Sequence, residues 1–356
     1  MNIFQSDFQK NWQVYFTDTN KLNEYTSIHI IELKNVEADG YDLDGAVFNG
    51  AMFENNNFKN ISAENSKFKN ARFKECKFIN CKFWSAEFTN VVFEDCEFIS
   101  TTFLQSKMIN VTIVNGKALE SEFDELEGTE LLIISSEFKM RSSFTDSKIP
   151  IKFQNTNLSG VNMMGMTGLF PLSFEGGVLD EVNFGKSYFS EVTLCRVKQG
   201  EGGIKFNSVT AKSISFEDVE MLKGVGMGWA NVELVRIVGG ELYGPSFKEA
   251  NIAKTVIRDA YVTRFATGHM GKVEVANSTL HRSGLFEGEI QELSVVNSTI
   301  DEIVGKNFKA DTVLWDNVTL NGKIDLTNAQ VKDFRPTRIQ RGPDLQLITT
   351  GSNMKF

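Results

Sequence analysis

The chain has little of several residue types on which common chemistries depend. Of its 356 residues, 3 are histidine, 4 are cysteine and 5 are proline. Three histidines far apart in the sequence (His29, His269 and His281) give no catalytic constellation and no zinc-binding pattern. Four cysteines are too few for a disulfide framework of this length, which favours a reducing environment. We therefore expect neither an enzyme nor a protein that depends on a metal or a cofactor.

Long hydrophobic runs and an excess of basic charge are also lacking. No apolar run approaches the roughly 18 residues that a membrane-spanning helix needs, so we expect no membrane span. The first residues lack the basic and apolar regions of a secretory signal, which favours the cytoplasm. With 37 basic and 46 acidic residues the net charge is −9, which argues against direct binding of nucleic acid through bulk charge.

What the sequence does contain is a repeat of five residues. From residue 43 to residue 123 the middle position of each five is never charged, and 12 of these 17 positions are phenylalanine, among them Phe48, Phe68 and Phe88. Two residues earlier stands a mostly small residue, such as Ala71 or Cys76. Two residues later stands, in most units, an asparagine or aspartate.

A period of five fits neither a helix nor an ordinary strand. It fits a square coil in which each unit forms one side, the large and the small residue point inward, and asparagine lies near the corner. Four sides make a coil of 20 residues, and successive coils pair as parallel strands about 4.8 Å apart. Phe48, Phe68 and Phe88 should then stack in one column, and the buried cysteines Cys76, Cys81 and Cys96 should be inert core residues.

This pattern resembles the pentapeptide-repeat family, and the resemblance implies an all-β fold, a right-handed quadrilateral parallel β-helix. One departure concerns the position before the central residue, where the family favours Asp or Asn and this chain carries residues such as Lys67, Arg72 and Glu97. The outward side chains at this position therefore differ from those that the family favours.

The repeat predicts three segments. Residues 1–40 lack the period and should cap the first coil with a short helix and a strand. Residues 41–331 should form the solenoid, in which the phase of the repeat slips at predicted loop insertions near 164–171, 198–203, 223–231 and 264–272. Residues 332–356 should form a C-terminal cap or a flexible tail.

Outward charge supplies the first candidate for partner binding. Residues 56–83 carry a net charge of +5, and residues 84–130 carry −8. Because each coil adds one layer to the stack, position along the sequence gives position along the stack. The sequence therefore predicts a basic band below an acidic band. Six acids that lie close together without an intervening base should repel one another unless a cationic partner relieves them. These six residues are Glu120, Glu122, Asp124, Glu125, Glu127 and Glu130.

Trp229 is the second candidate. It lies among glycines in a predicted loop and has no obvious core position. An exposed tryptophan is a common hot spot in protein interfaces. The alternative is that its ring folds back over the edge of a coil and caps it.

We expect a non-enzymatic scaffold that binds a protein partner through its flat faces, because solenoids use extended surfaces for binding. The resemblance permits a bacterial effector or adaptor, and so leaves export open, together with a homodimer formed through the solenoid ends. The alternative is an acidic mimic of DNA that binds a type II topoisomerase or another DNA-binding protein, as the resemblance also implies. A duplex 70 Å long carries about 41 negative charges, far more than the −12 of residues 1–331, so the charge favours the scaffold.

Overall fold

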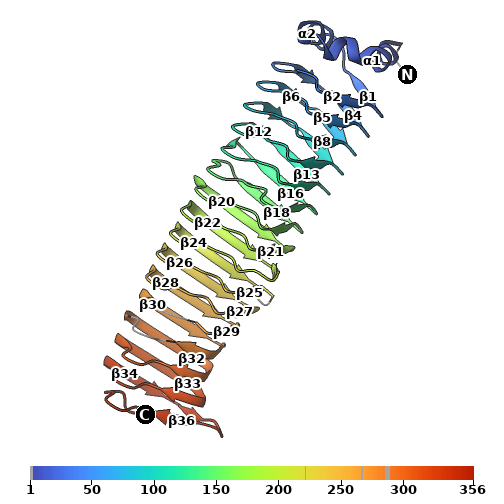
Figure 1. Cartoon of the computed structure of the whole chain (residues 1–356). Helices are drawn as coiled ribbons and strands as arrows, with labels where there is room; N and C mark the ends of the chain where they lie inside the picture. The colour runs from blue at the N-terminus through green and yellow to red at the C-terminus, as the bar shows by residue number, and fades with distance from the viewer. Residues whose placement is uncertain (1–2, 221, 266–267, 285–288) are drawn as a thin grey trace. The chain divides into compact units, whose positions relative to one another are not determined.

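The computed structural model describes residues 3–220, 222–265, 268–284 and 289–356. The chain divides into two compact units, Met1–Val178 (unit 1) and Leu179–Phe356 (unit 2). Each unit is a stack of coils whose strands pair in parallel with the coil before and the coil after (Figure 1). The predicted parallel β-solenoid is therefore confirmed, with about 15 turns in the described part of the chain.

Two helices, α1 (Ile3–Phe16) and α2 (Thr19–Thr26), precede the first coil of unit 1. The Asp18 side chain caps α2 by accepting hydrogen bonds from the backbone N–H groups of Asn20 and Lys21. The Trp12 ring lies 5.4 Å from that of Tyr41, so α1 packs on the first coil. That coil starts at Glu32, before the expected boundary at residue 41. Leu33 and Ala38 already occupy inward positions there, although neither is a phenylalanine.

Unit 1 has four faces, taken here in chain order as the first face, the second face, the bridge face and the fourth face. The strands of the first face are β1 (Glu32–Lys34), β4 (Met52–Glu54), β7 (Arg72–Lys74), β10 (Val92–Glu94), β13 (Val111–Val114), β16 (Leu131–Ile134), β18 (Ile151–Gln154) and β20 (Thr167–Glu175). Those of the second face are β2 (Glu37–Asp39), β5 (Asn57–Lys59), β8 (Lys77–Ile79), β11 (Glu97–Ile99), β14 (Lys117–Leu119), β17 (Glu137–Lys139) and β19 (Asn157–Ser159).

The bridge face has no strands, and its coils are joined by single parallel bridges such as Ser62 to Lys82 and Lys82 to Thr102. The strands of the fourth face are β3 (Val47–Asn49), β6 (Lys67–Lys69), β9 (Glu87–Thr89), β12 (Lys107–Ile109) and β15 (Glu127–Gly128).

Stacked phenylalanines fill the interior of unit 1. The ring centroids of Phe48 and Phe68 lie 5.0 Å apart, and those of Phe68 and Phe88 lie 4.9 Å apart, both pairs nearly parallel. The predicted column is therefore present, and all three side chains are buried. Rings of neighbouring columns meet edge to face, as Phe73 and Phe78 do at 5.6 Å. Both arrangements add to the free energy of burying the ring surface.

Asparagine occupies the corners because it tolerates the left-handed backbone conformation that the turn requires. Asn60 and Asn80 have φ angles of 51° and 52°. The side-chain amide of Asn80 donates to the side-chain oxygen of Asn60 one coil earlier at 2.7 Å, and Asn110 donates to Asn90 at 2.9 Å. The corners thus form ladders of hydrogen bonds along the stack.

The small inward residues bond to backbone carbonyls of the preceding coil. The Cys81 thiol lies 3.3 Å from the carbonyl of Phe58, and the Thr101 hydroxyl donates to the carbonyl of Phe78 at 3.1 Å. Burial raises the pKa of the Cys81 thiol to about 11. Cys81 therefore acts as a small core residue, and Cys76 and Cys96, in a neighbouring column, are buried as well.

Unit 2 uses longer strands and aliphatic inward residues such as Val235 and Ile257. After β21 (Val178–Asp180), which spans the boundary of the units, its strands are β22 (Tyr188–Cys195), β23 (Lys198–Gln199), β24 (Thr210–Glu217), β25 (Leu222–Lys223), β26 (Asn231–Val238), β27 (Glu241–Tyr243), β28 (Asn251–Arg258), β29 (Tyr261–Thr263), β30 (His269–Ala276), β31 (Thr279–Gly284), β32 (Glu289–Val304), β33 (Lys309–Asp325), β34 (Gln330–Thr337), β35 (Gln340–Arg341) and β36 (Gln346–Ile348).

The phase slips correspond to coils of unequal length more than to loops. The backbone N–H of Ala260 bonds to Ser278, 18 residues on, whereas that of Ser278 bonds to Ser298, 20 residues on. Strands β20, β23 and β30 occupy parts of the predicted loops at 164–171, 198–203 and 264–272. The pairing of each coil with its neighbours holds these segments in the ladder. Residues 266–267 of the last loop lie outside the described residues.

The C-terminal segment continues the solenoid. Strands β34, β35 and β36 pair with β33 and form a further coil beyond residue 331. The last residues then fold back on it. The Asn353 side-chain amide donates to the carbonyl of Val331 at 2.7 Å, and the Phe356 ring lies 5.5 Å from that of Trp315. Residues 332–356 thus combine a coil with a covering segment.

Candidate functional site

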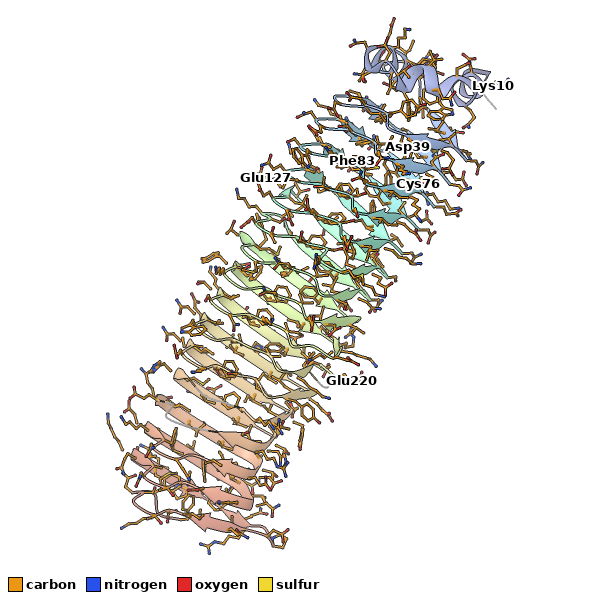
Figure 2. All side chains as sticks on the ribbon, in the orientation of Figure 1. Lys10, Asp39, Cys76, Phe83, Glu127 and Glu220 are labelled. Atoms are coloured by element: carbon orange, nitrogen blue, oxygen red, sulfur yellow. The ribbon has the colours of Figure 1, made fainter. Side chains whose placement is uncertain are left out.

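The interior of unit 1 offers little room for a ligand. The interior space among the phenylalanines from Phe48 to Phe83 amounts to about 20 Å³, which is room for a water molecule and not for a larger ligand. Any binding by these coils therefore falls to the outward side chains, the corners and the grooves between coils. Figure 2 shows these outward side chains, with Glu127 among those labelled, around the core that holds Phe83.

The six predicted acidic residues do not form one surface. Glu122 and Asp124 lie on the bridge face, Glu120 and Glu125 lie at the corners on either side of it, and Glu127 lies in β15 on the fourth face. Glu130 comes just before β16 on the first face. The structure therefore brings four of the six to the bridge face and its two corners.

Lysines of the following coil relieve part of the expected repulsion. Lys148 lies 3.8 Å from the Glu127 carboxylate, and Lys152 lies 2.8 Å from that of Glu130. The Glu125 carboxylate accepts a hydrogen bond from the Gln105 amide at 2.8 Å. The sequence analysis missed these partners because they are 20 or more residues away along the chain.

The expected basic and acidic bands also interlock. Lys77 of the basic segment lies 3.1 Å from Glu97 of the acidic segment, and Arg72 pairs with Glu94. On the fourth face the outward residues of successive coils alternate in sign, in the order Lys67, Glu87, Lys107, Glu127 and Lys148. Exposed pairs of this kind add little stability. Their effect is that the faces carry no large field of one sign.

The bridge face contains an exposed tryptophan that the sequence analysis did not single out. Trp84 follows the inward Phe83, and its side chain is 43% exposed. Backbone hydrogen bonds from Asn65 to Trp84 and from Ser85 to Leu104 align Trp84 with Glu64 on one side and Leu104 on the other. Its place directly after an inward phenylalanine was the available signal that it points outward.

We call the eight outward residues around this ring the Trp84 surface. They form two rows along the stack, Glu64, Trp84, Leu104 and Asp124 in one and Ser62, Lys82, Thr102 and Glu122 in the other. The Lys82 ammonium lies 6.0 Å from the Trp84 ring centroid, within reach of a cation–π contact. Three carboxylates against one ammonium give the Trp84 surface a net negative charge around an apolar centre.

A polar groove adjoins the Trp84 surface at the corner toward the fourth face. It has a volume of about 530 Å³, and its lining includes Glu125, Glu127, Asp146 and the Gln105 amide. Lys148 is the one base in this lining. The groove therefore extends the negative potential of the Trp84 surface around the corner.

Trp229 lies at a corner of unit 2 with a φ angle of 56°, and its side chain is 62% exposed. Its indole N–H donates a hydrogen bond to the Glu249 carboxylate of the next coil. The exposed ring supports a contact role better than burial over a coil edge. It lies in a different unit from the acidic stretch.

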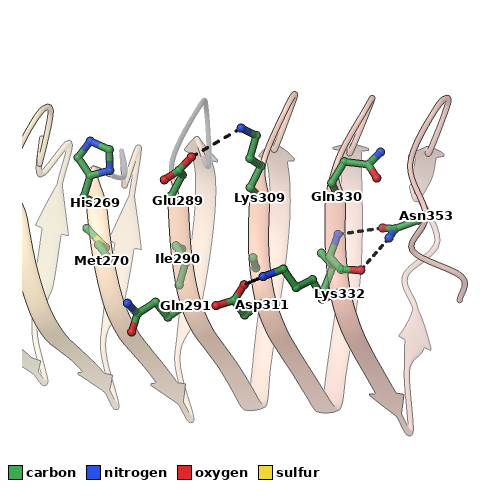
Figure 3. Close-up of a pocket in the computed structure, with 12 residues that line it drawn as sticks. His269, Met270, Glu289, Ile290, Gln291, Lys309, Asp311, Gln330, Lys332 and Asn353 are labelled. Atoms are coloured by element: carbon green, nitrogen blue, oxygen red, sulfur yellow. Dashed lines mark hydrogen bonds and ion pairs between the residues drawn. The ribbon is translucent and has the colours of Figure 1, made fainter.

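A second groove, with a volume of about 620 Å³, crosses four coils of unit 2 (Figure 3). Its charged residues neutralise one another, since Glu289 pairs with Lys309 at 3.6 Å and Asp311 with Lys332 at 2.7 Å. Its floor is formed by buried side chains such as Ile290. This balance gives the groove no preference for a charged ligand.

Within the described ranges, no group of three or more His, Cys, Asp or Glu side chains is placed to hold a metal ion. No helix among the described residues is both long and apolar enough to cross a bilayer. The two units combine a packed interior with outward surfaces that differ from coil to coil. They define the class of solenoid repeat proteins, whose binding surfaces lie outside.

Residues 57–95 and 76–112 match the family model of pentapeptide repeats, in eight copies. Residues 57–112 therefore carry pentapeptide repeats, and the parallel coils around them match the β-helix of such repeats. No curated protein matches the chain significantly.

Three solved structures are similar. QnrB1, a plasmid-mediated fluoroquinolone resistance protein, is 16% identical over 64% of this chain and 83% of its own, with a TM-score of 0.28. HetL, involved in heterocyst differentiation regulation in the cyanobacterium Nostoc sp. strain PCC 7120, is 9% identical over 93% and 98%, with a TM-score of 0.18. Tailspike protein 3 of bacteriophage CBA120 is 9% identical over 99% and 59%, with a TM-score of 0.20.

Proposed function

We propose that this chain is a non-enzymatic scaffold whose Trp84 surface binds a protein segment that carries basic residues beside an apolar one. The observation that carries the proposal is the 43% exposure of Trp84 on a face that needs no large apolar side chain. Tryptophan at the centre of a patch, with charged residues around it, is the usual composition of an interface hot spot. Leu104 extends the apolar centre, and Glu64, Glu122 and Asp124 supply the negative rim.

The charge of the rim selects the partner. Glu122 is exposed at the outer edge of the Trp84 surface, and the adjoining groove adds Glu125 and Asp146. A lysine or arginine of the partner would lower the repulsion among these carboxylates and steer the encounter. Lys82 beside the ring disfavours a uniformly basic segment and favours one with spaced positive charges.

Mimicry of DNA is the alternative function. A duplex presents one negative charge per 1.7 Å along its whole length. The alternation of Lys67, Glu87 and Lys107 along the fourth face, and the pairs Lys77–Glu97 and Arg72–Glu94, interrupt any continuous negative surface. These contacts favour the protein-binding scaffold, which needs only one acidic face.

We place the scaffold in the cytoplasm, in the role of a bacterial adaptor or effector. Cys76, Cys81 and Cys96 are not joined in disulfides, which is in keeping with a reducing compartment. We expect no direct contact with nucleic acid. Association of two copies through a solenoid end is a further proposal, and light scattering at several concentrations would test it.

Photo-crosslinking tests the proposed surface. A photoreactive residue at Leu104, on the bridge face, should crosslink a partner in extracts of the native host. The matched control is the same residue at Val114, a half-exposed position on the first face of the next coil. The crosslinked protein is then identified and purified, and its affinity is measured with the wild type and with Trp84→Ala.

Loss of a central tryptophan should cost about 2 kcal/mol or more, which is about 30-fold in affinity. Glu122→Gln with Asp124→Asn should slow association and flatten its dependence on salt. Equal crosslinking from Val114, or unchanged affinity of a folded Trp84→Ala protein, would show that the binding surface lies elsewhere.

A further inference from the structure

A hollow on the outside of unit 2 brings cations together without a carboxylate. It has a volume of about 740 Å³, and its lining consists of Lys223, Gly224, Tyr243, Gly244, Tyr261, Thr263, Arg264, His281 and Arg282. Backbone hydrogen bonds from Gly224 to Tyr243, from Gly244 to Thr263 and from Arg264 to His281 show that these residues come from successive coils. The hollow therefore runs along the stack at one corner.

Two glycines create the space. Gly224 and Gly244 take the left-handed corner positions, with φ angles of 63° and 65°, at which the next two coils carry Arg264 and Arg282. A Cβ atom added at Gly244 would meet nothing within 4 Å. The side chains of Lys223 and Arg264 flank this empty corner, two coils or about 10 Å apart along the stack.

The charges of the hollow are only partly compensated. Arg282 pairs with Glu302 at 2.7 Å. Among the residues that the structure describes, Lys223 and Arg264 form no ion pair. The nearby acids are engaged by lining residues. Asp301 accepts hydrogen bonds from His281 at 2.8 Å and from Asn321 at 3.2 Å, and Glu241 accepts one from the Tyr243 hydroxyl at 3.1 Å. In a chain with a net charge of −9, this site attracts anions.

An aromatic row forms the wall beside these cations. The ring centroids of Tyr243 and Tyr261 lie 6.1 Å apart, and those of Tyr261 and His281 lie 6.3 Å apart. All three side chains are half-buried, and the Tyr243 hydroxyl donates to the Glu241 carboxylate, so the aromatic rings form the wall of the hollow. An anion held by the arginines would place any organic group attached to it against this wall.

We propose that the hollow binds a phosphate monoester, with the phosphate held by Arg264, Arg282 and Lys223 and its organic part against Tyr243 and Tyr261. Two guanidinium groups on neighbouring coils suit the several oxygens and the double charge of a phosphate better than a single carboxylate. The phosphate can belong to a metabolite or to a phosphorylated side chain of a protein. This proposal is independent of the Trp84 surface.

Titration calorimetry at low salt tests it with four probes: inorganic phosphate, phenyl phosphate, ribose 5-phosphate and a phosphotyrosine peptide. We expect phenyl phosphate to bind more tightly than inorganic phosphate, and Arg264→Gln to weaken its affinity at least tenfold. Tighter binding of ribose 5-phosphate would indicate a metabolite, and tighter binding of the peptide would indicate a modified protein. Tyr261→Leu should abolish the preference for an organic group.

A further variant separates loss of binding from loss of fold. Gly244→Asn fills the empty corner with a residue that adopts the same left-handed conformation at other corners, such as Asn277. It should weaken binding while thermal unfolding stays near that of the wild type. The control is Lys69→Gln, which removes an exposed charge in unit 1 and should leave affinity unchanged. No binding of any probe at millimolar concentration, or equal losses in Lys69→Gln and Arg264→Gln, would overturn the proposal.

Discussion

Replacement of Phe78 by alanine tests the arrangement of unit 1 most directly. The Phe78 side chain is 2% exposed. Its ring stacks between those of Phe58 and Phe98, each at a centroid distance of 5.4 Å, and meets Phe73 and Phe83 edge to face. A buried Phe→Ala change costs about 3–5 kcal/mol, because the neighbours collapse only partly into the cavity. Here the neighbours are fixed by their own stacks, so the upper part of this range applies.

The size of unit 1 converts this cost into a temperature. About 1 kcal/mol lowers the Tm of a unit of this size by about 2–4 °C, so a loss of about 4–5 kcal/mol in Phe78→Ala should lower it by about 8–20 °C. The matched control is Lys77→Ala at the preceding, outward position. Lys77 is 41% exposed and pairs with Glu97, so its loss should cost no more than about 0.5 kcal/mol.

Circular dichroism during heating and urea titration would measure both variants against the wild type. The inward and outward assignment requires a large loss for Phe78→Ala and a small one for Lys77→Ala. Similar losses from the two variants, or a larger loss from Lys77→Ala, would refute it.

Three further predictions test other parts of the solenoid. Gly240→Ala should destabilise unit 2 by more than about 1 kcal/mol in urea titration, because its φ angle is 68° and an added Cβ would lie 2.2 Å from the Val219 carbonyl oxygen; Gly244→Ala, with open space, should cost less. The Cys81 thiol, with its pKa near 11, should resist iodoacetamide at pH 8 in the folded protein and react after unfolding, as mass spectrometry would show. The Thr327 hydroxyl, which donates to Asp325 at 2.6 Å, holds the pKa of that carboxyl below its usual value. The ionised Asp325 carboxylate should therefore stabilise the fold above about pH 4, and this contribution should be lost as the pH falls through its lowered pKa. The urea midpoints of Asp325→Asn should lack this part of the pH dependence.

The sequence predicts well the features that depend on the five-residue repeat within each coil. Phe48 and Phe68 stack because every fifth residue points inward, and Asn60 and Asn80 form a corner ladder because asparagine tolerates the left-handed turn. The same period places residues 20 apart side by side. The pair Lys77–Glu97, which joins the basic segment to the acidic segment, could therefore have been derived from the repeat.

Other features depend on how coils of different length align. The outward position of Trp84 could have been predicted from the sequence, because Trp84 follows an inward phenylalanine. That Glu64 and Leu104 lie beside it follows only from the stacking of the coils. In unit 2 the spacing between partners changes, as the 18-residue step from Ala260 to Ser278 shows. The alignment of Arg264 with Arg282, which is 18 residues further along the chain, could therefore not be obtained from a constant period.

The pairing of the coils explains how such a protein can acquire a binding surface without a change in its core. Trp84 and Leu104 belong to one surface row because their coils pair, while Phe83 and Phe103 stack inside at 4.9 Å. Outward substitutions alter the row and leave the stack intact. A residue inserted at the corner between β9 and β10 should be accommodated at that corner, because the 18-residue coil of unit 2 keeps Val262 in register with Leu280 and Thr263 in register with His281. Leu104 should then stay beside Trp84, because the pairing of the coils, more than their length, determines which outward side chains lie side by side.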